Sequence, residues 1–393
     1  MFQTYLNRQS IFVNKSALDD EFLPVNLLHR DREQKQIASI LLPALRGEKP
    51  SNLFIYGKTG TGKTIGAKSV CRELEGFARE NNRPVKIVYV NAQMKKVADT
   101  EYRLISSIAQ QYGVNLPSTG LPTEKIYKAF ISAVENTKAL SIIIIDEIDN
   151  VVRKCGNDLL YNLMRLNSEL SESRVSVIGI TNDLNLLKFI DSRVKSSLSE
   201  EELVFPPYDA NQLSDILSSR AEIAFLPNAL DQAVVPKCAA YAAKEHGDAR
   251  RALNILRLAG ELAERSGASK IEAEHVDAAL DKLDTETVVE FVKSQPLQSK
   301  AVLYSILFLR NSTPDFTTGD IYDKYRQTCT LFRQKCLTQR RVSDLVTELA
   351  GVGIISTNLI SKGRYGRSKT VDILMNGPTL DKVVNVLKGD FSY

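Results

Sequence analysis

The residues best suited to chemistry form one short run, Gly57-Lys58-Thr59-Gly60-Thr61-Gly62-Lys63-Thr64. It fits G-x-x-x-x-G-K-[ST], a loop whose backbone N–H groups surround the phosphates of a nucleotide. Lys63 can reach the β- and γ-phosphates, and the Thr64 hydroxyl can bind Mg²⁺. A buried strand at 52–56 and a helix from 65 to 77 would flank the loop, and the helix N-terminus adds partial positive charge. The run predicts a site for ATP or ADP with Mg²⁺, built from Gly60, Thr61, Gly62, Lys63 and Thr64.

Two acidic residues follow a run of four isoleucines at 142–145. Such a β-branched run is typical of a central parallel strand covered on both faces, and ligands of these sheets bind at the carboxyl ends of the strands. Asp146 can therefore hold Mg²⁺, and Glu147 can orient or deprotonate an attacking water. Asn182 ends another buried run and would stand beside Asp146, where it can hold that water or sense the γ-phosphate. An ordinary turn asparagine explains the same position equally well.

Residues farther along the chain could close over a bound nucleotide. The run Gly247-Asp248-Ala249-Arg250-Arg251 begins a predicted helix with Asp248 as a suitable N-cap. Arg250, in the first turn of that helix, could reach back to the phosphates. The other candidates come shortly before this helix: Tyr208 and Arg220 for the adenosine and phosphates, and Ile216 and Leu217 for the base.

The elements that would position these residues alternate between strand and helix. Strands at 52–56, 85–91, 141–145, 175–180 and 202–205 predict an α/β fold with a parallel sheet. Two further helices, near 101–112 and 122–136, would fit between the second and third strands, separated by a turn at 117–120. We expect an N-terminal tail at 1–22, a nucleotide-binding domain at 23–207, a helical lid at 208–284 and a winged-helix domain at 285–393. The lid helices would span 209–224, 228–245, 248–265 and 271–283.

The last domain has the pattern of a winged helix-turn-helix: helices at 297–310, 319–333 and 338–350, followed by a basic hairpin. In the third helix Thr338 is a good N-cap, and an apolar stripe leaves the N-terminal end polar, as in a recognition helix that meets base edges in the major groove. An arginine at a glycine-flanked hairpin tip suits a narrow minor groove. A protein-docking winged helix is the alternative. The DNA-binding candidates are Gln339, Arg340, Arg341, Ser343 and Asp344 in the helix, and Lys362, Arg364, Tyr365, Arg367 and Lys369 in the hairpin.

Composition sets the remaining limits. The chain of 393 residues is 43% hydrophobic and 25% charged, which indicates a soluble protein of two or three domains. No apolar run approaches the ~20 residues that a membrane span needs, and the N-terminus has no signal-peptide pattern. The five cysteines form no C-x-x-C pair, so we expect a cytoplasmic protein without structural zinc. Residues 290–393 carry 15 Lys and Arg against 9 Asp and Glu, whereas the rest of the chain is slightly acidic. This asymmetry points to a polyanionic partner for the last domain.

Five runs in a fixed order resemble the archaeal Orc/Cdc-type replication initiators, which are AAA+ ATPases that bind replication origins. They are the loop at 57–64, Ile-Asp-Glu-Ile-Asp at 145–149, Thr-Asn-Asp at 181–183, the run from 193 to 208, and Gly-Asp-Ala-Arg-Arg-Ala-Leu at 247–253. The resemblance extends from about Leu23 to the hairpin. It implies an ATP-regulated initiator that binds double-stranded origin DNA, helps recruit the replicative helicase, acts with paralogous initiators, and is associated with the nucleoid.

The resemblance also implies roles for single residues. Asp146 and Glu147 would serve Mg²⁺ and water, Asn182 would be the first sensor, and Arg250 the second. Tyr208 and Arg220 match nucleotide contacts of the family, and the segment with Pro24 and Arg30 resembles the lead-in that borders adenine. The extra helix between the second and third strands resembles an insertion that makes a second DNA contact, through Lys95, Lys96 and Arg103; these residues fit a solvated helix face equally well.

One departure from the family pattern concerns hydrolysis. Many AAA+ relatives place an arginine finger just before the last strand. Here that region reads Lys195-Ser196-Ser197-Leu198, and the preceding arginine is Arg193. We therefore expect a slow ATPase in which ATP and ADP act mainly as conformational states. The alternatives are a nucleotide-switched transcription regulator and a AAA+ DNA motor, the latter indicated by strong DNA-stimulated hydrolysis.

Overall fold

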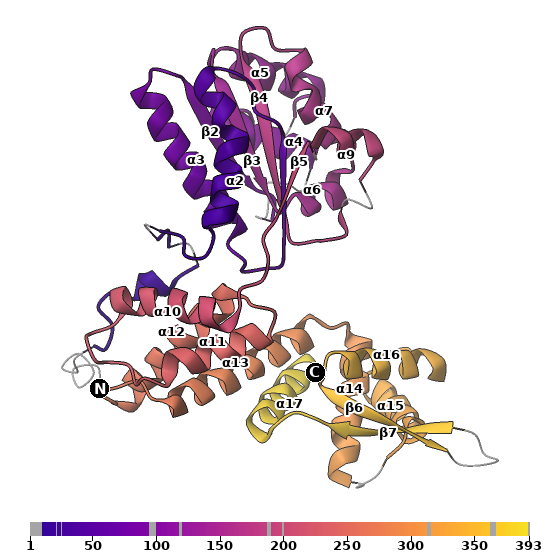
Figure 1. Cartoon of the computed structure of the whole chain (residues 1–393). Coiled ribbons are helices and arrows are strands. Elements are labelled where there is room, and N and C mark those ends of the chain that lie inside the picture. Colours follow the sequence, from indigo (N-terminus) through magenta and orange to yellow (C-terminus); the bar gives the residue numbers. More distant parts are fainter. Residues whose placement is uncertain are drawn as a thin grey trace. The chain divides into compact units, whose positions relative to one another are not determined.

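Figure 1 shows the chain as a computed structural model. It describes residues 10–20, 22–24, 26–93, 100–117, 120–186, 190–198, 200–312, 316–361 and 367–391. The chain divides into two compact units, Met1–Val276 and Asp277–Tyr393. Each unit is described by itself. In the described residues, no helix combines the length and the apolar character needed to cross a membrane.

The first unit is built on a parallel sheet whose strands, among the described residues, follow the order β2-β3-β4-β1-β5. The sequence-based prediction of this sheet is confirmed. No strand begins or ends more than one residue away from its predicted boundary. Because all the strands are parallel, their carboxyl ends meet at one edge, where the predicted site residues follow β1, β3 and β4. The strands are β1 (Leu53–Tyr56), β2 (Val85–Asn91), β3 (Leu140–Asp146), β4 (Arg174–Thr181) and β5 (Glu201–Val204).

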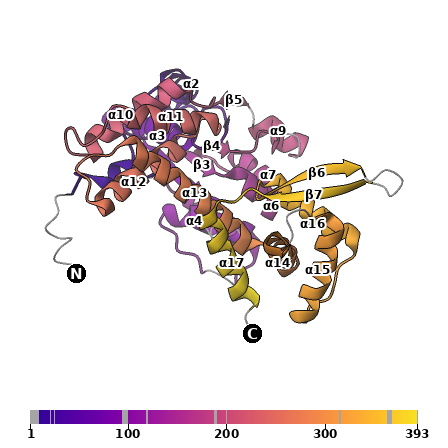
Figure 2. The ribbon, with the colours of Figure 1, turned by 90° about the horizontal axis from the view of Figure 1, so that it is seen from below.

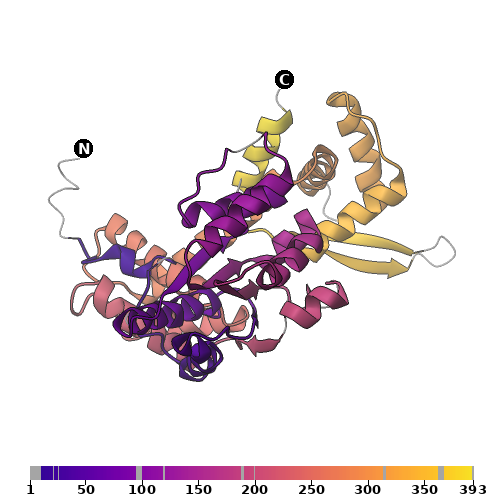
Figure 3. The ribbon, with the colours of Figure 1, turned by 90° about the horizontal axis from the view of Figure 1, so that it is seen from above.

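Alternation along β3 explains why helices cover both faces of the sheet. Ile142 and Ile144 pack in one buried cluster with α2 (Asp31–Leu41), η2 (Leu42–Arg46) and α3 (Lys63–Glu80). Ile143 and Ile145 face the opposite cluster. Figure 3 shows the indigo helices and the purple helices on opposite sides of the sheet. The second cluster contains residues of α4 (Glu101–Gln111), α5 (Thr123–Glu135), α6 (Ile148–Cys155), α7 (Asp158–Arg165), η3 (Leu166–Ser168) and α9 (Ser192–Leu198).

The lid contains α10 (Ala210–Ala224), α11 (Val234–Lys244), α12 (Ala249–Ser266) and the first residues of α13 (Ala273–Ser294), most of which belongs to the second unit. Helix α11 begins six residues later than the predicted 228. Asn228 has a left-handed backbone, and Leu230 forms a β-bridge with Ile271, so this stretch is committed to non-helical hydrogen bonds. Helix α13 continues past the predicted end at 283.

Part of the predicted N-terminal tail packs on the lid. Phe12 forms an antiparallel bridge with Phe225, and η1 (Lys15–Leu18) buries Ala17 and Leu18. Lys15 also forms an ion pair of 2.8 Å with Glu261 of α12. Within the expected tail at 1–22, residues 10–18 are thus a packed part of the first unit, because these apolar side chains are removed from water against α10 and α12.

The second unit has the predicted winged helix-turn-helix, which Figure 2 shows with its hairpin of β6 and β7. The elements are α14 (Leu297–Ser312), α15 (Thr318–Leu331), α16 (Gln339–Gly351), β6 (Ile355–Ser361), β7 (Arg367–Ile373) and α17 (Gly377–Phe391). Helix α17 was not predicted, although Val383, Leu387 and Phe391 recur at four-residue spacing and are buried in the core of this unit.

Candidate functional site

The loop between β1 and α3 closes around the Lys63 ammonium. Gly60 and Gly62 have φ of 71° and 90°, a backbone conformation that favours glycine. The Lys63 Nζ atom donates to the carbonyl oxygens of Gly57 at 2.9 Å and Lys58 at 2.7 Å. Lys63 is also the first residue of α3, so the ammonium lies beside a helix N-terminus. This arrangement suits an anion, which would meet the ammonium and the helix N–H groups together.

Asn182 connects Lys63 with Glu147. The Lys63 Nζ atom donates to Asn182 Oδ1 at 2.6 Å, and Asn182 Nδ2 donates to Glu147 Oε1 at 2.6 Å. Parallel pairing of β3 with β4 places Asp146 opposite Ile180, which explains why Asn182 lies so close to Glu147. The structure thus joins three residues that the sequence separates by 119 and 35 positions.

The charges in this cluster influence one another. Burial lowers the pKa of Lys63 to about 8, although the carboxylates of Glu147 and Asp146 act in the opposite direction. Burial, followed by the charges of Asp146 and Asp149, raises the pKa of Glu147. A carboxylate with a raised pKa is a better proton acceptor, which suits the base role predicted for Glu147.

Glu147 also has an unusual backbone, with φ 56° and ψ 45°, directly after β3 and at the N-cap of α6. Non-glycine residues rarely adopt this left-handed conformation, and such strain gathers at functional sites. The turn directs Glu147 toward Asn182 rather than along the strand.

Asp146 has its two oxygens bound differently. Oδ2 accepts the Thr64 hydroxyl at 2.8 Å and the Tyr89 hydroxyl at 2.8 Å, while Oδ1 accepts the Glu147 N–H at 3.0 Å. Asp146 is 5% exposed. A hydroxyl and a carboxylate at this edge of the sheet form the oxygen donor set that Mg²⁺ prefers, so the two residues fit the predicted metal role.

The lid reaches this loop at the start of α12. Asp248 caps the helix by accepting the N–H groups of Arg250 and Arg251, and the Ala249 N–H donates to the Gly60 carbonyl at 3.2 Å. A Cβ added at Gly60 would lie 1.7 Å from Asp248 Oδ1. Arg250 is exposed and lines the pocket between the loop and the lid.

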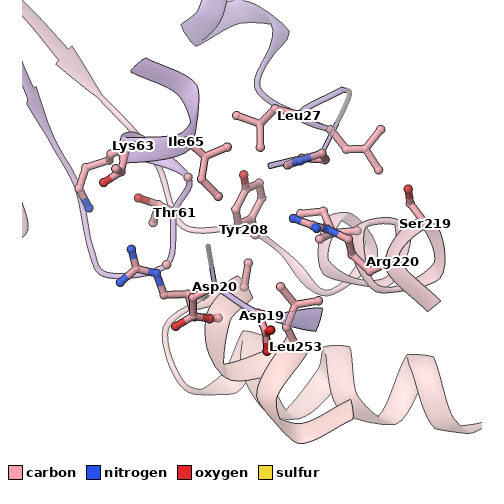
Figure 4. Close-up of a pocket in the computed structure, with 18 of the residues that line it drawn as sticks. Asp19, Asp20, Leu27, Thr61, Lys63, Ile65, Tyr208, Ser219, Arg220 and Leu253 are labelled. Atoms are coloured by element: carbon pink, nitrogen blue, oxygen red, sulfur yellow. The ribbon is translucent and has the colours of Figure 1, made fainter. Parts of the chain in front are cut away.

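Figure 4 shows this pocket, with Thr61, Lys63 and Ile65 on one side, Ser219 and Arg220 on the other, and Tyr208 between them. Pro24 also lines it. Arg220 is only 6% exposed, and its guanidinium donates to the carbonyls of Ala17 and Phe22 at 3.1 Å each. Arg220 therefore also fixes the segment that borders the pocket.

Arg30 has a different place from the predicted one. It is 2% exposed and does not belong to the pocket lining among the described residues. Its guanidinium donates to the carbonyls of Thr61 and Pro206 and lies 3.8 Å from the ring centroid of Tyr208. Arg30 thus supports the loop and Tyr208 from behind. Leu217 is likewise buried in the lid, whereas Ile216 lines the pocket.

Sequence reasoning missed several residues of the pocket and its surroundings. Asp19, Asp20, Ser219 and Leu253 line the pocket, and Tyr89 contacts Asp146. No local pattern marks these positions, because they reach the site through the packing of separate elements. In the sequence, only the second aspartate of the run Ile-Asp-Glu-Ile-Asp, Asp149, indicated a further buried polar contact near the site.

That aspartate, Asp149, supports the segment that carries Asn182. It accepts the Thr181 hydroxyl at 2.8 Å, and its other oxygen lies 3.3 Å from the Arg153 guanidinium. Arg153 also contacts Asp183 at 3.1 Å. Helix α6 and the end of β4 are therefore joined on both sides of Asn182.

The predicted DNA-binding residues are distributed over α16 and the hairpin. The Thr338 side chain accepts the Arg341 N–H at the N-terminus of α16, and the predicted apolar stripe is buried. Arg341 contacts Glu348 at 3.2 Å, and Lys369 of β7 contacts Thr347 at 3.3 Å. Gln339, Arg340, Arg341 and Asp344 are exposed and Ser343 is half-buried. The predicted residues Lys362, Arg364 and Tyr365, like Lys95 and Lys96 of the insertion, lie outside the described residues; Arg367 begins β7.

Arg193 lies at the start of α9, where its guanidinium contacts both oxygens of Asp191 at 3.2 and 2.9 Å. It also lies 5.3 Å from the ring centroid of Tyr161. The guanidinium is thus held on the surface of its own domain.

Three domain families match parts of this chain. Residues 53–201 match the ATPase family associated with various cellular activities (AAA), residues 214–281 the Cdc6 AAA+ ATPase-type lid domain, and residues 290–382 the CDC6 C-terminal winged helix domain. An ORC1-type DNA replication protein of Pyrococcus furiosus is 47% identical over 397 residues, which cover 100% of this chain and 93% of that protein. The chain belongs to the ORC1-type DNA replication proteins. The resemblance noted in the sequence is confirmed.

Other ORC1-type proteins show a similar degree of identity to this chain. One from Methanosarcina mazei is 47% identical over 376 residues, 95% of this chain and 90% of that protein. Among solved structures, the Orc1 protein of Aeropyrum pernix in complex with DNA matches with a TM-score of 0.80 and 43% identity, covering 97% of this chain and 98% of that one. Cdc6p of Pyrobaculum aerophilum, at 21% identity and a TM-score of 0.60 over 97% of this chain and 100% of that one, shares the fold. The match of residues 53–201 to an ATPase family implies that this ORC1-type protein binds a nucleotide.

Proposed function

We propose that this ORC1-type protein is an ATP-regulated replication initiator that binds double-stranded origin DNA. One observation carries the nucleotide part: Lys63, Asn182 and Glu147 form a connected cluster beside Thr64 and Asp146, in a pocket that the start of α12 helps to close. The winged helix in the same chain supports the DNA part.

The nucleotide end would work through groups already close together. Gly60, Thr61 and Gly62 supply backbone N–H groups for the phosphates, and Lys63 adds its charge. Thr64 and Asp146 would hold Mg²⁺, which neutralises phosphate charge when bound. Glu147 would accept a proton from water while Asn182 orients Glu147. Arg250, exposed at the lid, would reach the phosphates, and Tyr208, Pro24, Arg220 and Ile216 would border the nucleoside.

The DNA end would use the exposed N-terminal part of α16 together with the hairpin. Gln339, Arg340, Arg341 and Ser343 would make base and phosphate contacts, and the hairpin residues Lys362, Arg364, Tyr365, Arg367 and Lys369 would enter the minor groove. The DNA complex of the 43% identical Orc1 protein supports DNA binding by this chain. Arg103 of α4 remains a candidate for a second contact.

We expect slow ATP turnover by the isolated protein. Arg193 would have to leave Asp191 before it could complete the site of a neighbouring molecule, as an arginine finger does. ATP and ADP would then act chiefly by favouring different conformations of the lid. Recruitment of the replicative helicase, action with paralogous initiators and a nucleoid-associated place in the cytoplasm complete the proposal.

Footprinting on genomic origin fragments tests both parts. The wild type is expected to protect duplex DNA with a pattern that differs between ATP and ADP, while Lys63→Ala gives one pattern in both. Lys58→Ala is the matched control, because Lys58 lies in the same loop with its ammonium near His246 instead of Asn182. Absence of protected duplex in every nucleotide state would contradict the proposal. Genome-wide protection at promoters instead of origins would favour a transcription regulator, and strong DNA-stimulated hydrolysis a motor.

A further inference from the structure

We infer that Tyr89 is a positioning residue for the Mg²⁺ site, where its hydroxyl holds Asp146 in the orientation that faces the metal. The inference rests on the proposed function, since it takes Thr64 and Asp146 as the residues that hold Mg²⁺. Tyr89 lies in β2, outside every motif that the sequence presents for this site.

The geometry of Asp146 shows what Tyr89 contributes. Tyr89 and Thr64 each donate a hydrogen bond of 2.8 Å to the same oxygen, Oδ2, and the Glu147 N–H donates to Oδ1. Three donors from β2, α3 and the turn after β3 therefore hold one carboxylate. A carboxylate offers about four lone-pair positions, so one direction remains for a further ligand. Of the two hydroxyls on Oδ2, the Thr64 oxygen is itself a proposed metal ligand, which leaves Tyr89 as the donor whose only task there is to orient.

Tyr89 is itself held from two sides. The Lys68 ammonium lies 3.4 Å from the centroid of its ring, a cation–π arrangement with a residue one turn beyond Thr64 in α3. At the backbone, Gln111 accepts the Tyr89 N–H at 3.2 Å and donates to the Tyr89 carbonyl at 2.8 Å. Because β2 is an edge strand of the sheet that the described residues form, the Gln111 amide takes the place of a neighbouring strand at this residue.

These contacts connect Tyr89 with α4 on one side and with the Asp146 carboxylate on the other. Gln111 is the last residue of α4, and its amide fixes the strand position from which the phenol reaches Asp146. A tyrosine that merely satisfied its hydroxyl at a sheet edge would need neither a shared acceptor with Thr64 nor two restraints on its position. The difference between the two cases lies in the Mg²⁺ dependence of nucleotide binding.

The test compares wild type and Tyr89→Phe in the binding of fluorescently labelled ADP, titrated with Mg²⁺. We expect the Mg²⁺ concentration that gives half of the Mg²⁺-dependent tightening to rise about tenfold, as for other residues that orient metal ligands. The affinity for ADP without Mg²⁺ should stay unchanged, because the phosphate-binding loop is intact. Binding of Mn²⁺ in the presence of ADP, followed by electron paramagnetic resonance, should weaken by the same factor.

Tyr56→Phe is the matched control. Tyr56 ends the strand β1 of the same sheet, and its hydroxyl contacts Glu202 at 3.4 Å rather than Asp146. Its Mg²⁺ requirement should equal that of the wild type. Gln111→Leu provides a second variant, which keeps the phenol but removes its backbone restraint, and it should raise the Mg²⁺ requirement by a smaller factor.

The outcomes separate the inference from the proposal beneath it. If the wild type binds no ADP, the proposed function fails. If the wild type binds ADP with a Mg²⁺ dependence that Tyr89→Phe leaves unchanged, the inference on Tyr89 is wrong while the proposed function stands. A loss of ADP affinity that is equal with and without Mg²⁺ also overturns it. Should Tyr89→Phe fail to fold, an unchanged Mg²⁺ requirement in folded Gln111→Leu overturns it as well.

Discussion

The Thr181 hydroxyl donates a buried hydrogen bond of 2.8 Å to Asp149 Oδ1. Thr181 ends β4 and is followed by Asn182, whereas Asp149 lies in α6, two residues after Glu147. The bond therefore ties together the two segments whose next contact is that between Asn182 and Glu147. The positions of Asn182 and Glu147, which would face the nucleotide, therefore depend on the buried hydrogen bond between Thr181 and Asp149.

Replacement of Thr181 by valine should keep the shape and remove that bond, together with the 3.0 Å bond that the same hydroxyl accepts from the Asp183 N–H. We expect the free energy of unfolding of the domain to fall by about 1.5–3 kcal/mol, because a buried carboxylate loses a donor. Urea denaturation followed by circular dichroism measures the change. Ser176→Ala is the control on the same strand: its hydroxyl donates to the neutral Ser51 carbonyl at 3.1 Å, and its removal should cost about 1 kcal/mol. Equal losses in the two variants would contradict the role given to Asp149.

The lowered pKa of Lys63 predicts proton uptake on nucleotide binding. Burial sets this pKa to about 8 instead of 10.5, so the ammonium is lost as the pH rises through that value. Phosphates favour the charged form, so binding at pH 8 should take up about half a proton, and the affinity for ADP should fall at higher pH. Calorimetry in buffers of different ionisation enthalpy counts the protons.

Two comparisons test the assignment of that proton to Lys63. At about pH 6.5 the ammonium is already charged and uptake by Lys63 should be close to zero. Lys58→Ala should behave as the wild type. Uptake that is the same at both pH values would show that another group is responsible.

Gly60→Ala should disturb the contact between the lid and the loop that joins β1 to α3. The added Cβ would lie 1.7 Å from Asp248 Oδ1, and the φ of 71° is strained for alanine. The strain alone costs about 1–2 kcal/mol, and displacement of Asp248 adds to it. We therefore expect a lower thermal midpoint and faster amide exchange at the start of α12.

Gly113→Ala is the control for backbone strain. Gly113 has φ of 86°, and a Cβ there would meet nothing within 4 Å. It should show the strain cost without a change of exchange in α12. If both variants raised the rate of amide exchange at the start of α12 equally, the contact between Gly60 and Asp248 would not be what stabilises that helix start.

Glu348→Gln should strengthen DNA binding. Glu348 holds Arg341 at 3.2 Å on the exposed side of α16, where it neutralises a charge proposed to meet phosphate. We expect duplex affinity to rise about threefold, with a steeper dependence on salt concentration. Fluorescence anisotropy at several salt concentrations measures both quantities.

The matched control is Glu286→Gln, which makes the same charge change at a residue near Lys282 in α13. A gain that is equal in both variants would reflect net charge only, and no gain in Glu348→Gln would place Arg341 away from the DNA.

Several elements were predictable because the information is local. The loop at 57–64 is contiguous, its glycines permit the left-handed backbone that it needs, and the isoleucine run before Asp146 has the character of a strand buried on both faces. The late start of α11 was not predictable in this way, because Leu230 is held by Ile271, far along the chain. Helix α17 did carry a four-residue apolar spacing that could have been used.

The amino-acid sequence by itself determined the nucleotide loop, the acidic strand end, the order of the domains and the family. Only the tertiary structure decided which side chains meet: that Asn182 connects Lys63 with Glu147, that Tyr89 shares an oxygen of Asp146 with Thr64, and that Arg30 supports the loop from behind. The physical reason is that a motif constrains neighbouring residues through the backbone. Contacts between β2, β3, β4 and the lid depend instead on strand order and on the burial of the helices packed against them.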